Sequence, residues 1–232
     1  MPFLSSDKIT TMDELIQKIA VYALPVIFAI TLHEAAHAFA AKYFGDATAY
    51  LQGRMSLNPV KHIDPFGTII IPLVLLFLPG SFLFGYAKPV PIDFGRLRKP
   101  KRDMAWVALA GPMANLVMAV MWQILLIVLL ALNSDADIAQ FFLQVAQAGV
   151  FTNLLIFAFN LFPIPPLDGG RVLFSILPNK QAYQFARLEP YGFFIVLALV
   201  YFQVLNFWMA PVMYVANIAV QLLVFPFKFI LI

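Results

Sequence analysis

The sequence predicts an all-α polytopic membrane protein with about five to six transmembrane or re-entrant segments and a small membrane-associated β element. Of its 232 residues, 62% are hydrophobic, whereas soluble domains are about 45–50% apolar. The mean hydropathy is +0.86. Apolar stretches recur along the chain, and a membrane-spanning helix needs roughly 20 apolar residues. This distribution leaves no room for a separate soluble domain of ordinary size.

The expected membrane segments follow one another with polar connections between them. The stretch 66–84 is short and contains two prolines, which favours a re-entrant segment; a full span with the opposite N-terminal orientation is the alternative. The last two stretches are either two spans or one bent helix with its break at Asn206 and Pro211. The six stretches are 19–44, 66–84, 104–132, 138–162, 190–207 and 209–231.

Charge predicts how these segments are oriented. Five basic residues occupy the seven positions from Arg96 to Arg102, and such clusters mark the cytoplasmic side of a span. The stretch 104–132 then runs outward, the acidic connection 133–137 lies outside, and 138–162 returns. This order brings Asp168 near the cytoplasmic face.

The pentapeptide His33-Glu34-Ala35-Ala36-His37 lies within the first apolar stretch. Ionisable residues inside a membrane are costly and therefore predict a functional site. Residues four apart share one helix face, so both imidazoles can reach one metal ion. Glu34 lies about 100° round the helix from His33, beside such an ion, where a general base acting on water belongs.

A catalytic zinc site usually takes three protein ligands, and with no cysteine in the chain the third must be an acid or a histidine. Asp168 follows a proline-rich segment and precedes Gly169-Gly170. Irregular backbone at membrane depth is tolerated where it lines a buried cavity, so Asp168 is the favoured candidate. His62, in a turn-rich loop, is the alternative; its ordinary interpretation is an interfacial loop histidine.

Over about residues 19–180 the chain resembles the site-2 protease family of intramembrane zinc metalloproteases. HEAAH is similar to the HExxH motif of that family, and FNLFPIPPLDGGRVL to its Asp-Gly motif. AGPMANL, residues 110–116, is similar to a Gly-Pro-x-x-Asn segment on the intervening span. GYAKPVPI is similar to the stretch where related enzymes have membrane-associated β structure. The chain resembles compact bacterial-type members without a PDZ or CBS domain.

The resemblance implies one Zn²⁺ per chain, bound by His33, His37 and Asp168, with Glu34 as the catalytic base. Asn160 matches a polar position near the zinc of relatives and is expected to donate a hydrogen bond to the substrate or the oxyanion.

A structural hydrogen bond between helices is the alternative for Asn160 and the expected role of Asn153. Asn115, with Gly111-Pro112, is expected to serve helix packing. Residues 86–92 are expected to form an edge strand that holds the substrate, with a plain linker as the alternative.

The implied function is hydrolysis of peptide bonds in or near transmembrane segments, that is, regulated intramembrane proteolysis. The expected partners are transmembrane protein substrates and the lipid bilayer, not nucleic acid, and the oligomeric state stays open. We expect an integral protein of the bacterial inner membrane with its active site toward the cytoplasm. A membrane metal-ion transporter or binding protein is the alternative. The expected parts are an N-terminal amphipathic segment (1–18), the metalloprotease core (19–180) and C-terminal transmembrane segments (181–232).

Overall fold

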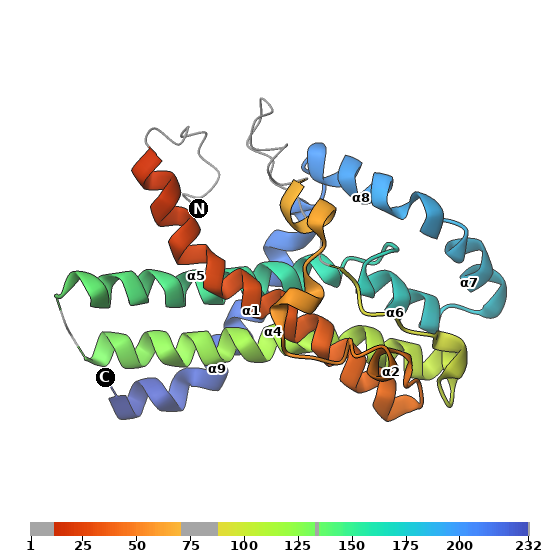
Figure 1. The fold of residues 1–232 in the computed structure, drawn as a ribbon, viewed down its shortest axis with the longest axis horizontal. Helices are drawn as coiled ribbons and strands as arrows, with labels where there is room; N and C mark the ends of the chain where they lie inside the picture. The colour runs from red at the N-terminus through yellow and green to blue at the C-terminus, as the bar shows by residue number, and fades with distance from the viewer. Residues whose placement is uncertain (1–11, 71–87, 133–134, 232) are drawn as a thin grey trace.

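The computed structural model describes residues 12–70, 88–132 and 135–231 (Figure 1). Four helices in these residues are long and apolar enough to cross a membrane. They are α1 (Met12–Phe44), α4 (Pro100–Ala131), α5 (Asp137–Asn160) and α9 (Asn206–Leu231). The predicted helical membrane protein is thereby confirmed.

The spans form one bundle in which α4 and α5 run side by side, joined by a short connection, and α1 crosses both (Figure 1). Helix α9 packs against both α4 and α5. The core shared by α4, α5 and α9 is built around Trp122, whose ring lies against Gly149. Small residues such as Ala119 and Ala146 let the backbones approach, as is usual between membrane helices.

Shorter helices complete the chain. Several of them, α2, η4, α6 and α7, lie at the end of the bundle where α1 ends and α4 begins (Figure 1). Their bounds are α2 Thr48–Leu51, η2 Pro59–His62, η3 Pro65–Ile70, η4 Phe94–Arg96, α6 Asp168–Ile176, α7 Asn179–Ala186, η5 Glu189–Tyr191 and α8 Gly192–Tyr201.

The region 190–231 contains one candidate span. Helix α8 has 10 residues and at 1.5 Å per residue is about 15 Å long, half the thickness of a bilayer core. The helices α8 and α9 are separated by residues 202–205, where Gln203 has a φ of 59°. The break therefore falls directly before Asn206, and Pro211 lies inside α9.

The predicted β element is not supported, because the described part of the chain contains no strand. In residues 88–92, Lys88 N donates to His62 O, and Val90 N donates to the Glu34 carboxylate. Pro89 and Pro91 have no N–H to offer. The donors of Lys88 and Val90 are thus bonded to side chains or backbone outside the segment, and Pro89 and Pro91 have none. Tyr86 and Ala87 lie outside the described residues, as does the predicted re-entrant stretch beyond Ile70.

Candidate metal centre

The two predicted histidine ligands lie on α1 and face one stripe of α4. His33 and His37 are 6% and 4% exposed. Across from them stand Val107, Gly111 and Asn115, which share one helix face because they are four residues apart. The Nδ1 of His37 donates to Val107 O at 2.7 Å, and the Nδ1 of His33 donates to Asn115 Oδ1 at 2.6 Å. The stripe on α4 therefore orients both rings.

Gly111 lets α4 approach the rings closely. A Cβ at this position would lie 2.4 Å from His37 Nε2 and 2.7 Å from His33 Nε2. No side chain fits there without displacing the imidazoles, so the backbone of α4 forms one wall of the centre.

The third predicted ligand, Asp168, is the first residue of α6 and is buried. A Cβ on Gly169 would lie 2.2 Å from Leu161 O, and one on Gly170 would lie 2.4 Å from Pro165 N. The two glycines therefore let the start of α6 pack directly on the backbone that follows α5. This packing brings Asp168 Oδ2 to 3.2 Å from the Nε2 atoms of both histidines.

The three converging atoms fit a zinc ion. His33 Nε2 and His37 Nε2 are 3.1 Å apart, and each is 3.2 Å from Asp168 Oδ2. Two atoms bound to a tetrahedral zinc at 2.0–2.1 Å lie about 3.3 Å apart. No described donor satisfies the buried Asp168 Oδ2.

The tautomers explain why that oxygen is unsatisfied. Both Nδ1 atoms face acceptor-only oxygens and carry the ring protons, so both Nε2 atoms present lone pairs. Two nitrogen lone pairs and a carboxylate oxygen then point at one place, an arrangement that a bound cation would stabilise. Nitrogen and oxygen donors of this kind suit Zn²⁺.

Glu34 lies between the two histidines in sequence and is half-buried. Its Oε2 accepts a hydrogen bond from Val90 N at 2.9 Å. The segment 88–92 thus holds the carboxylate beside the centre.

Two other candidate residues have hydrogen bonds within their own segments. Asn160 Nδ2 donates to Ile156 O of its own helix at 3.0 Å. His62 is buried and its Nε2 donates to Ser56 O at 2.8 Å. The group of His, Asp and Glu side chains that converges in the described residues contains Asp168 and not His62.

The sequence predicts packing roles for Gly111 and Asn115 and no role for Val107. Gly111 and Asn115 are four residues apart, like the two histidines, and this common spacing is the signal that relates them. The contact of Val107 uses a backbone carbonyl, for which a sequence carries no signal.

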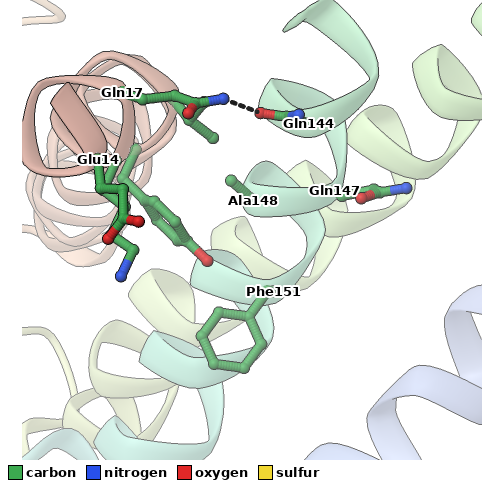
Figure 2. A pocket seen from close by; sticks show the side chains of 9 residues that line it. Glu14, Gln17, Gln144, Gln147, Ala148 and Phe151 are labelled. Atoms are coloured by element: carbon green, nitrogen blue, oxygen red, sulfur yellow. Dashed lines mark hydrogen bonds between the residues drawn. The ribbon is translucent and has the colours of Figure 1, made fainter. Parts of the chain in front are cut away.

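A cavity of about 330 Å³ lies between α1 and α5 near the start of α1 (Figure 2). Its lining includes Glu14, Gln17 and Gln147, and Gln17 donates to Gln144 at 3.4 Å. None of the three converging ligands lines it, so the metal centre is separate from this cavity.

The fold and the centre together define a class of protein. Apolar helices form a membrane bundle, and one of them carries two histidines that converge with an aspartate from a distant turn. A glutamate follows the first histidine, as in metalloproteases with an HExxH helix.

Comparison with known proteins agrees. Residues 127–202 match the family described as "Peptidase family M50". The chain is 38% identical over 182 residues to "Putative zinc metalloprotease YwhC" of Bacillus subtilis, covering 76% of this chain and 78% of that protein. It is 33% identical over 188 residues to "Putative zinc metalloprotease Rip2" of Mycolicibacterium smegmatis, covering 81% and 69%. No solved structure matches. The chain belongs to peptidase family M50, the site-2 protease family, and is a metalloprotease of the membrane.

Proposed function

We propose that this protein is a zinc-dependent intramembrane endopeptidase that hydrolyses peptide bonds in or near transmembrane segments of other membrane proteins. The observation that carries the proposal is the convergence of His33, His37 and Asp168 inside a bundle of apolar helices, with Glu34 beside them. In this proposal His33, His37 and Asp168 bind one Zn²⁺ per chain.

The proposed mechanism assigns a chemical role to the metal, to Glu34 and to Asn160. Bound zinc would polarise the scissile carbonyl and lower the pKa of water. Glu34 takes the proton of the attacking water and passes it to the leaving amine. Asn160 is proposed to donate a hydrogen bond to the oxyanion, and this role requires its bond to Ile156 O to open.

The substrate in this proposal is a transmembrane helix that unwinds locally, because a helix keeps its carbonyls in hydrogen bonds. The bilayer delivers it, and no nucleic acid is involved. We place the enzyme in the bacterial inner membrane with its active site toward the cytoplasm. The basic residues around the metal centre support that side.

The test compares wild type, Glu34→Gln and Glu14→Gln in liposomes with a transmembrane test substrate. Glu14 lies on the same helix, at the cavity remote from the ligands, so Glu14→Gln is the matched control. We expect stoichiometric zinc in all three proteins and cleavage lost only in Glu34→Gln. A removed general base costs about 10²–10⁴-fold in rate.

The same variants separate the proposal from a metal transporter. A transporter moves metal across the liposome membrane, and its flux does not depend on one proton acceptor. Unchanged cleavage in Glu34→Gln, or zinc flux without cleavage in the wild type, would contradict the endopeptidase.

A further inference from the structure

A chain of buried amides runs from the metal centre through three helices. Asn115 on α4 and Asn153 on α5 are both fully buried. Asn115 Nδ2 donates to Asn153 Oδ1 at 3.0 Å, and Asn153 Nδ2 donates to Gly149 O at 2.9 Å. At the other end, Asn115 Oδ1 accepts from His33 Nδ1. The chain therefore links the ring of a ligand on α1 to the backbone of α5.

The direction of every hydrogen bond in this chain is fixed. Gly149 O can only accept, so the group of Asn153 that faces it must be the NH₂. The oxygen of Asn153 then faces Asn115 and receives its NH₂. The oxygen of Asn115 is left to face His33, whose Nδ1 must be the donor.

Asn115 also grips α1 at a second point. Its Nδ2 donates to Ala29 O at 3.1 Å, one helical turn before His33. The Asn115 amide thus donates to Ala29 O and accepts from His33 Nδ1 on adjacent turns of α1. Both contacts require the same orientation of the amide group. His37 has no such side chain, because its Nδ1 donates directly to Val107 O.

We propose that Asn115 and Asn153 form a relay of fixed polarity that keeps the proton of His33 on Nδ1 and its Nε2 lone pair toward the metal. Both are positioning residues, and Asn153 acts through Asn115. The inference rests on the zinc site of the proposed function. Hydrogen-bond partners of metal-binding histidines tune metal affinity by about 10–100-fold.

The first experiment measures the zinc dissociation constant of the full chain by chelator competition. We expect Asn115→Leu to raise it about 10–100-fold and Asn153→Leu about 10-fold. The double variant should match Asn115→Leu, because Asn153 has no separate route to His33. Gln123→Leu is the matched control: it removes another interhelical amide bond, from Gln221, and should leave the constant within about twofold.

The second measurement reads the tautomers by ¹⁵N NMR, for which three histidines make assignment simple. His62 donates through Nε2 to Ser56 O, so it reports the opposite tautomer and serves as an internal reference. At alkaline pH without zinc, wild-type His33 should carry its proton on Nδ1 only. Asn115→Leu, which removes the acceptor that faces His33 Nδ1, should show both tautomers at His33 and leave His62 unchanged.

The outcomes separate two failures. Zinc binding in wild type that Asn153→Leu leaves unchanged would overturn the relay alone. A single Nδ1–H tautomer of His33 in Asn115→Leu, or effects of the two leucine changes that multiply, would overturn it as well. Absence of zinc binding in the wild type would overturn the proposed function and the relay with it.

Discussion

Gly111 contributes to the metal centre by having no side chain. Its α-carbon sits between the two histidines, on the face of α4 that also carries Val107 and Asn115. The distance between the α1 and α4 backbones at this point is set by that gap. Gly111, which has no reactive side chain, therefore determines the space available to the rings of His33 and His37.

Gly111→Ala should weaken zinc binding at least about 10-fold, because the new Cβ would lie 2.4 Å from His37 Nε2. Alanine is the better helix former by roughly 0.5–1 kcal/mol, so the loss is local rather than global. Chelator competition gives the affinity. Met113→Ala, on an exposed position of the same helix, is the control; equal affinity in both variants would contradict this role of Gly111.

The Asp46 carboxylate joins two of the connecting segments through hydrogen bonds. Its Oδ1 accepts from Thr48 N and its Oδ2 from Asp93 N at 2.8 Å. Burial opposes ionisation, but these hydrogen bonds, together with that from the Thr48 hydroxyl, and the charge of Arg96 hold the pKa of Asp46 below its ordinary value. The ionised form therefore fastens the residues after α1 to those before α4.

A lowered folded-state pKa makes stability depend on pH in one direction. The contribution of Asp46 is full above the unfolded-state pKa of about 3.9 and is lost as pH falls from there through the folded-state value. Asp46→Asn should cost about 1–3 kcal/mol at neutral pH and progressively less below pH about 4. Urea unfolding of wild type and variant across pH measures this. The exposed Asp137→Asn should change stability by about 0.5 kcal/mol at most, and a pH-independent Asp46 difference would refute the argument.

Among single residues, sequence reasoning succeeds where the signal is local. The i, i+4 spacing of His33 and His37 and the proline-glycine context of Asp168 are visible in short segments, and the structure brings these three side chains together. The hydrogen bond from His33 to Asn115 joins residues 82 apart. The shared four-residue spacing relates the two helix faces but does not identify which side chains are bonded. The hydrogen bond of Asn160 to Ile156 O of its own helix likewise depends on its rotamer, which the sequence does not specify.

At the scale of elements, the close packing of α4 against α5 depends on a large residue, Trp122, that faces a glycine, Gly149. Trp122 of α4 fills the space that Gly149 of α5 leaves. The indole Nε1 is buried without a partner in the described chain. Packing against Gly149 thus fixes the Trp122 ring in a position where its Nε1–H has no acceptor among the described residues.

Gly149→Ala should destabilise the bundle by about 1–3 kcal/mol through overpacking, since its Cβ would lie 2.2 Å from the Trp122 ring. Trp122→Phe in the same chain should recover most of the loss, because the smaller ring yields space and removes the unsatisfied N–H. Thermal unfolding in detergent of the two singles and the double measures the coupling. Additive losses would show that the ring and the glycine do not share this space.

Elements that could not be predicted are those whose length or pairing is set by contacts. The apolar stretch 190–207 is nearly long enough for a membrane span, yet α8 ends at Tyr201. Its start is seated against Pro165, where a Cβ on Gly192 would lie 2.2 Å from Pro165 O. The residues expected to form a strand are bonded instead to Glu34, His62 and Arg54.

At the scale of the whole molecule, positive charge is concentrated at the end that holds the metal centre. Twelve of the 15 Lys and Arg residues lie in the connections from α1 to α4 and from α5 to α8 or in the flanking helix turns. They are Lys42, Arg54, Lys61, Lys88, Arg96, Arg98, Lys99, Lys101, Arg102, Arg171, Lys180 and Arg187. The positive-inside rule then predicts this end in the cytoplasm.

The absence of cysteine makes this orientation simple to measure. Single cysteines are introduced at Gln181, exposed on α7, and at Ala136, exposed before α5. In intact cells a membrane-impermeant maleimide should label Ala136→Cys and not Gln181→Cys, and lysis should expose both. Labelling with the two positions exchanged would reverse the predicted topology.

The position of Asp168 in the chain also affects the time at which the enzyme can act. Synthesis proceeds from the N-terminus, so His33 and His37 enter the membrane with the first span, and Asp168 follows His37 by 131 residues. A nascent chain that stops before α6 holds two ligands of the three that a catalytic zinc site requires. The proposed peptidase therefore cannot complete its metal site until synthesis has passed Asp168.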